Sequence, residues 1–106
     1  MDEWPPPEAR LTAILWRVEG HLERGESLAA AQAVDEGQGL GEDELLAGLR
    51  HLAAAGYRSQ IGEPARARLQ LAHARRRLAP FLPERRGIDL AGLVSAVAVL
   101  VESAGD

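Results

Sequence analysis

Cysteine and lysine are absent from this 106-residue chain, and aromatic residues make up only 4% of it. Without cysteine the protein has no disulfide, no thiolate zinc site, no iron–sulfur cluster and no thiol nucleophile. Because aromatic side chains are so few, the core has to be built mainly from leucine, alanine and valine, which suit closely packed helices. These absences favour an all-helical fold.

Long apolar runs are also missing. The longest, Leu90–Val101, would measure about 18 Å as a helix, which is well short of a bilayer core of about 30 Å. The N-terminal residues, MDEWPPPEAR, are acidic and rich in proline, unlike a secretory signal. We therefore expect a cytoplasmic protein with no membrane contact.

No motif in the chain indicates catalysis, a cofactor or a metal. The glycines within Gly37–Gly41 have the spacing GxGxG, but the acids Glu42–Glu44 follow them and would repel a phosphate. No serine stands in a nucleophile elbow. The histidines are not spaced as HxxxH, the arrangement that places two metal ligands on one helical face. They are His21, His51 and His73.

Apolar residues at helical spacing predict a small bundle of four to five helices. We expect a single helical domain over residues 8–104, preceded by a proline-rich arm of residues 1–7. In the second helix Ser27 is expected to cap the N-terminus and Leu28 to point inward, and Gly56 is expected to end the third. The expected helical ranges are 8–24, 27–36, 42–55, 65–78 and 89–103.

Two of these segments leave a strand open as the alternative. Residues 65–74 alternate between small or apolar and polar side chains, which is a strand pattern, although their strong helix formers favour a helix after Pro64. Residues 93–101 are rich in β-branched valine, but Asp89 is a plausible helix cap before them. The stretch GYRSQIGEP indicates a loop or a hairpin tip, so a short hairpin is placed near residues 57–70.

The net charge of −4 conceals a strong separation of charge along the chain. Residues 1–49 carry eleven acids against three arginines, whereas residues 50–86 carry nine arginines against two acids. Seven arginines lie within 21 residues, a concentration that suits an acidic protein partner or nucleic-acid phosphates. The alternative is that they pair internally with the acidic N-terminal half. The seven are Arg66, Arg68, Arg75, Arg76, Arg77, Arg85 and Arg86.

The last predicted helix is apolar on nearly every side, which is typical of a helix that is central in a bundle or covered by another subunit. In so small a domain, a homodimer interface on this helix is the expected explanation. The residues expected to mediate self-association are Leu90, Leu93, Val94, Val97, Leu100 and Val101.

The order of segments in Glu26–Arg58 resembles the helix-turn-helix part of a winged-helix regulator: a short helix, a glycine turn, the leucine-patterned ELLAGLRHLAAAG and an exit at GYR. The resemblance implies that the second helix enters the major groove and that SQIGEPARARL forms the wing. However, Glu42–Glu44 at the tip of that helix oppose phosphate contact.

The function predicted from the sequence is a non-enzymatic protein-interaction module or accessory regulator. It self-associates through the C-terminal helix and contacts an acidic partner through the arginine-rich segment. A winged-helix-like DNA-binding regulator is the alternative.

Overall fold

The computed structural model describes residues 4–104. It contains five α-helices, one short 3-10 helix and a two-stranded hairpin, which confirms the expected small helical bundle. The helices are α1 (Pro7–Glu23), α2 (Ser27–Glu36), α3 (Asp43–Gln60), α4 (Pro64–Leu78) and α5 (Leu90–Ala104).

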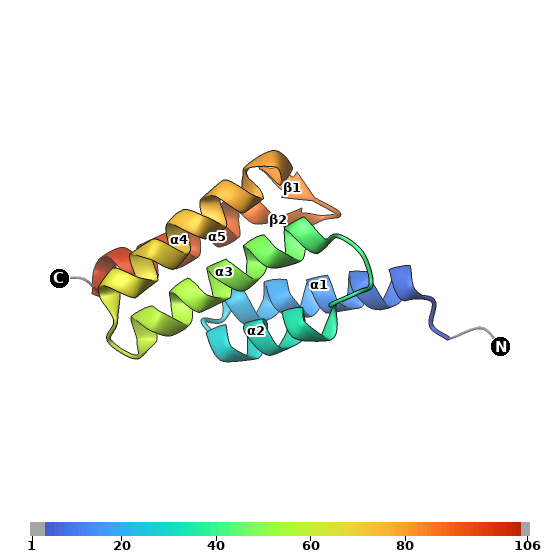
Figure 1. The fold of residues 1–106 in the computed structure, drawn as a ribbon, viewed down its shortest axis with the longest axis horizontal. Helices are drawn as coiled ribbons and strands as arrows, with labels where there is room; N and C mark the ends of the chain where they lie inside the picture. Colours follow the sequence, from blue (N-terminus) through green and yellow to red (C-terminus); the bar gives the residue numbers. More distant parts are fainter. Residues whose placement is uncertain (1–3, 105–106) are drawn as a thin grey trace.

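Helix α3 lies in the middle of the bundle (Figure 1). It packs most extensively against α4, and it also contacts α2 and α5, while α1 packs against α2 and α5. One hydrophobic cluster joins buried side chains from all five helices and from the hairpin. Helix α3 therefore packs against three of the other four helices, and α1 completes the bundle by packing against α2 and α5.

Gly56 does not end the third helix, contrary to expectation, because α3 continues to Gln60. The absence of a side chain serves a different purpose, since a Cβ at this position would collide with the buried Ser27 of α2. Ser27 is accordingly inside the bundle, and Glu26 occupies the cap position of α2 without a side-chain hydrogen bond. The prediction that Leu28 points inward is also wrong, because this side chain is 55% exposed.

Helix α4 spans Pro64–Leu78, so the helical prediction for this segment is confirmed and the strand alternative is wrong. The connection from α3 is short: Ile61 caps α3, and Gly62 turns the chain with a φ of +80°. The expected loop and hairpin near residues 57–70 are therefore absent, and most of the proposed wing is the end of α3 and the start of α4.

The hairpin lies further along the chain, after the 3-10 helix Ala79–Phe81. Its strands, β1 (Glu84–Arg85) and β2 (Ile88–Asp89), are antiparallel, with Arg85 opposite Ile88. The turn between them, Arg86 and Gly87, has positive φ at both residues, the conformation of a tight two-residue hairpin turn. Ile88 inserts into the core and so anchors the hairpin to the bundle.

Helix α5 follows the hairpin directly, which confirms a helix for this segment rather than a strand. Asp89 is its cap, as predicted, because its Oδ1 accepts a hydrogen bond of 3.0 Å from the Gly92 N–H. Within residues 4–104, none of the helices combines the length and the apolar character needed to span a membrane.

Candidate functional site

The carboxy-terminal arginines of the arginine-rich segment are bound by acids from the other half of the chain. The Arg85 guanidinium forms two hydrogen bonds with Glu42, from Nε at 2.9 Å and from Nη2 at 3.0 Å. Arg86 donates to Glu8 at 3.0 Å and lies 3.7 Å from Glu42. Arg77 and Glu44 approach to 3.4 Å. For these three arginines, internal pairing is therefore observed.

Glu42 is the centre of this cluster, and its side chain is only 13% exposed. The hydrogen bonds from Arg85 hold the pKa of the Glu42 carboxyl below its ordinary value and outweigh the opposing effect of burial, and the charge of Arg86 contributes in the same direction. The same contact raises the pKa of Arg85. Both partners of the pair therefore stay ionised, and the cluster ties the hairpin to the start of α3.

The amino-terminal arginines of the segment, all on α4, are bound differently. Arg66 lies 3.7 Å from Glu63, one turn away, and Arg76 donates a hydrogen bond to His73 on the same helix. Arg68 and Arg75 are exposed, and within residues 4–104 neither has a carboxylate in ion-pair range. The seven predicted residues thus differ in their partners: three pair with acids from the other half of the chain, and Arg68 and Arg75 have no carboxylate in range among residues 4–104.

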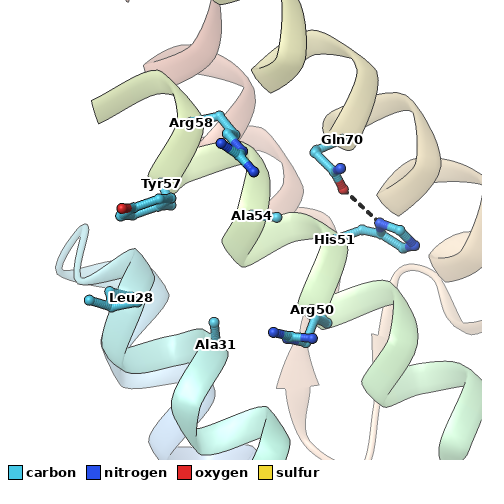
Figure 2. Close-up of a pocket in the computed structure, with 8 residues that line it drawn as sticks. All are labelled: Leu28, Ala31, Arg50, His51, Ala54, Tyr57, Arg58 and Gln70. Atoms are coloured by element: carbon cyan, nitrogen blue, oxygen red, sulfur yellow. Dashed lines mark hydrogen bonds between the residues drawn. The ribbon is translucent and has the colours of Figure 1, made fainter. Parts of the chain in front are cut away.

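A groove of about 390 Å³ lies on the outer side of α3, between α2 and α4 (Figure 2). Helix α3 forms its floor, and Ala54 lies between Arg50 and Arg58 along this helix. Helix α2 supplies one wall of the groove and α4 the other. The lining side chains include two guanidinium groups and no carboxylate. They are Leu28, Ala31, Arg50, His51, Ala54, Tyr57, Arg58 and Gln70.

Histidine and glutamine side chains join α3 to α4 along one wall of this groove. His51 donates a hydrogen bond from Nδ1 to Gln70 Oε1 at 2.7 Å, and its ring lies 5.2 Å from that of His73. Partial removal from water lowers the pKa of His73, and the charges of Arg76 and His51 lower it further. His73 therefore tends to be neutral. Arg50 and Arg58 place two guanidinium charges in the groove.

Five of the six residues predicted to mediate self-association belong to the core of the protein itself. Leu90, Leu93, Val94, Val97 and Val101 are buried, and Leu100 is half-buried. Their burial has a simple reason: α5 packs against α3, α4 and α1. The five buried side chains are therefore not exposed to a second copy in this structure. The exposed side of α5 carries Val99, which is 64% exposed.

A second hollow, between α1 and α5, is acidic. Glu19, Glu23 and Asp89 line it, but Glu19 accepts a hydrogen bond from the Asp89 backbone N–H at 3.2 Å, and the Asp89 carboxylate caps α5. Within the described residues, 4–104, no group of three or more histidine, aspartate or glutamate side chains is placed to hold a metal ion.

The groove between α2 and α4 was not predicted from the sequence. The one signal in the sequence is the spacing of Arg50, Ala54 and Arg58, which places them on one side of α3. The walls of the groove come from separate helices, which this spacing does not include. Comparison with protein-family models, with curated proteins and with solved structures found no match for the chain.

Proposed function

We propose that this chain is a cytoplasmic, non-enzymatic helical module that binds an acidic protein partner, and that α4 of the arginine-rich segment makes the contact. One observation supports this location. Arg68 and Arg75 are exposed without an ion-pair partner among residues 4–104, whereas Arg77, Arg85 and Arg86 are bound to internal carboxylates.

The spacing of these two arginines suits a shared contact. They are seven residues apart, which is about two helical turns, or about 10.5 Å along one side of α4. Ala72, between them, is small and exposed, so a partner can approach the helix closely. A surface with carboxylates at a similar separation would meet both guanidinium groups at once.

Binding an acid here has a low electrostatic cost, because no internal carboxylate has to be displaced from Arg68 or Arg75. Each guanidinium presents several N–H donors in a plane that matches the two oxygens of a carboxylate. The excess of acids elsewhere in the chain has little influence beyond the Debye length of about 8 Å at physiological salt. The local positive charge of α4 therefore determines what it attracts.

A binding titration with matched variants tests the proposal. The probe is a short fluorescein-labelled polyglutamate peptide, and the variants are Arg68→Ser/Arg75→Ser and the control Arg17→Ser/Arg24→Ser. Both variants lose two positive charges, but Arg17 and Arg24 pair with Glu36 and Glu26 near α2. We expect the α4 variant to lose most of the affinity and the control to keep it, as measured by anisotropy. Equal losses in the two variants would contradict a site on α4.

Duplex DNA is the competing ligand that the sequence suggested. The wing expected from the winged-helix resemblance is replaced by the turn between α3 and α4, and the exposed acids Asp43 and Glu44 stand at the start of α3. Acids there oppose phosphate contact. In the same titration we expect little binding of duplex DNA at physiological salt; tight binding with a steep salt dependence would favour the DNA-binding alternative instead.

The homodimer expected from the sequence stays a prediction. Because the six residues assigned to it lie in or beside the core, an interface on α5 would have to use the opposite side of that helix, where Val99 is exposed.

A further inference from the structure

The groove between α2 and α4 has the chemistry of a peptide site. We propose that it binds an amphipathic helix of a partner protein that carries two carboxylates about two turns apart on either side of apolar side chains. The site is distinct from the proposed contact on α4, because its lining residues include neither Arg68 nor Arg75.

Arg50 and Arg58 provide the charged contacts. They lie eight residues apart on α3, which places them about 12 Å apart along the helix axis. Each has a neighbouring acid: Arg50 Nε is 3.2 Å from Asp35, and Arg58 Nη1 is 2.8 Å from Glu63. A guanidinium has five N–H donors, so each keeps donors for a second carboxylate.

Small side chains create the apolar space between the two arginines. Ala31 on α2 and Ala54 on α3 leave the centre of the groove hollow, and Tyr57 and Leu28 border it (Figure 2). Leu28 is 55% exposed, so an apolar side chain entering the groove would remove it from water. The volume of about 390 Å³ accommodates side chains of a docking helix rather than its backbone.

A helix matches this layout better than a small dicarboxylate does, because the two arginines are too far apart for one short molecule to reach both. On a helix, residues i and i+7 lie on the same side and about 10.5 Å apart, with i+3 and i+4 between them. Acids at the outer positions and leucines at the inner ones would then reach Arg50, Arg58 and the space over Ala54. This is the helix-in-groove mode of recognition.

The experiment uses the full chain and a labelled alanine-rich helical peptide with glutamate at i and i+7 and leucine at i+3 and i+4. Ala54→Trp fills the groove, and Ala13→Trp places the same side chain on the exposed side of α1, away from both proposed sites, as the matched control. We expect Ala54→Trp to weaken binding by about tenfold or more, as for a blocked central contact, and Ala13→Trp to leave it unchanged. Equal effects of the two substitutions would overturn the proposal.

Charge and apolar contacts are tested on the peptide itself. Changing both glutamates to glutamine should weaken binding by about fivefold, since exposed ion pairs are individually weak, and changing both leucines to serine should weaken it more. A peptide that binds equally well without its leucines would overturn the helix-in-groove mode.

Backbone amide shifts in NMR spectra provide a readout that does not depend on a variant. When the helical peptide binds, the shift changes should concentrate at residues 28–31, 50–58 and 70. Shifts confined to α4 around residues 68–75 would overturn the groove as the site.

The experiments can contradict one of the two proposals without contradicting the other. If Arg68→Ser/Arg75→Ser loses polyglutamate but keeps the helical peptide, and Ala54→Trp loses the helical peptide, both stand. If that variant loses the helical peptide while Ala54→Trp keeps it, the groove proposal fails and the α4 contact stands. If polyglutamate binding survives in the α4 variant while Ala54→Trp still blocks the helical peptide, the proposed function fails and the groove proposal stands.

Discussion

The two ends of the arginine-rich segment use the same residue type for different purposes. At the carboxy-terminal end, Arg85 and Arg86 hold the hairpin against Glu42 and Glu8. At the amino-terminal end, Arg68 has no carboxylate in range within the described part of the chain. A single run of positive charge in the sequence thus contains both arginines that join parts of the fold and exposed arginines without a carboxylate in range in the described structure.

The fold, and not the order of residues, produces this difference. Arg85 meets Glu42 across 43 positions of sequence, and Arg86 meets Glu8 across 78. The hairpin carries these arginines towards the start of α3 and of α1, where the acids are. Helix α4 presents Arg68 and Arg75 to solvent instead. Charge counts along the chain therefore cannot separate the two groups.

The largest effect on stability is expected where the carboxy-terminal end of α4, whose Arg77 pairs with Glu44, packs against α3. A Cβ at Gly48 would lie 2.7 Å from Leu78 Cγ and 3.4 Å from Arg77 Cβ, so Gly48→Leu must push the two helices apart. We expect the unfolding free energy to fall by about 3 kcal/mol in urea titrations. The control is Gly20→Ala, where the Cβ meets only the flexible end of Arg24 and the helix gains up to about 1 kcal/mol. A Gly48→Leu protein as stable as the control would show that this contact is loose.

A smaller effect is expected from Glu42→Gln, which keeps the side-chain shape but removes the charge that Arg85 and Arg86 bind. The loss should be about 1 kcal/mol at neutral pH, as for a weakened hydrogen-bonded contact. Because the folded pKa of Glu42 is lowered, its stabilisation is fully present above the ordinary value of 4.5 and is lost as pH falls through the folded pKa. The gap between the native protein and the variant, measured by urea unfolding, should therefore shrink as the pH falls below 4.5 and close once it has passed through the folded pKa. A gap that is constant with pH would exclude Glu42 as its source.

The smallest effect is expected from Arg68→Ser/Arg75→Ser. Because neither side chain has an ion-pair partner in the described structure, we expect the unfolding free energy to change by no more than about 0.5 kcal/mol, as for other surface substitutions. Thermal and urea unfolding measure this directly. A loss as large as that of Glu42→Gln would remove the contrast between the two ends of the segment.

The helices were predictable where their signals are local. Ala67, Leu71, Ala74 and Leu78 are buried on one side of α4, as their spacing predicted, and Asp89 caps α5 as its position before the apolar run suggested. Gly56 misled the prediction because a glycine near the end of a helical pattern usually marks its termination. Its actual role, close contact with Ser27, depends on a second helix that the local pattern does not include.

The candidate functional surfaces were harder to predict because they depend on how separate helices meet. The apolar character of α5 was interpreted as a subunit interface, but contacts with three other helices explain the burial of its apolar residues. The groove requires α2 and α4 to stand on either side of α3. The sequence left open whether the arginines pair with acids of the N-terminal half. The structure shows such pairs for Arg77, Arg85 and Arg86. It shows none for Arg68 or Arg75 among the described residues.

Glu42 and Arg86 share one further property. Among residues 4–104 they are the two non-glycine residues with positive φ, at +54° and +56°, and they face each other across 3.7 Å. Glycine would suit either backbone better but would remove one side of the contact. The two turns are thus linked by opposite charges. The double substitution should therefore cost slightly less unfolding free energy than the sum of the two single ones, which a double-mutant cycle would measure.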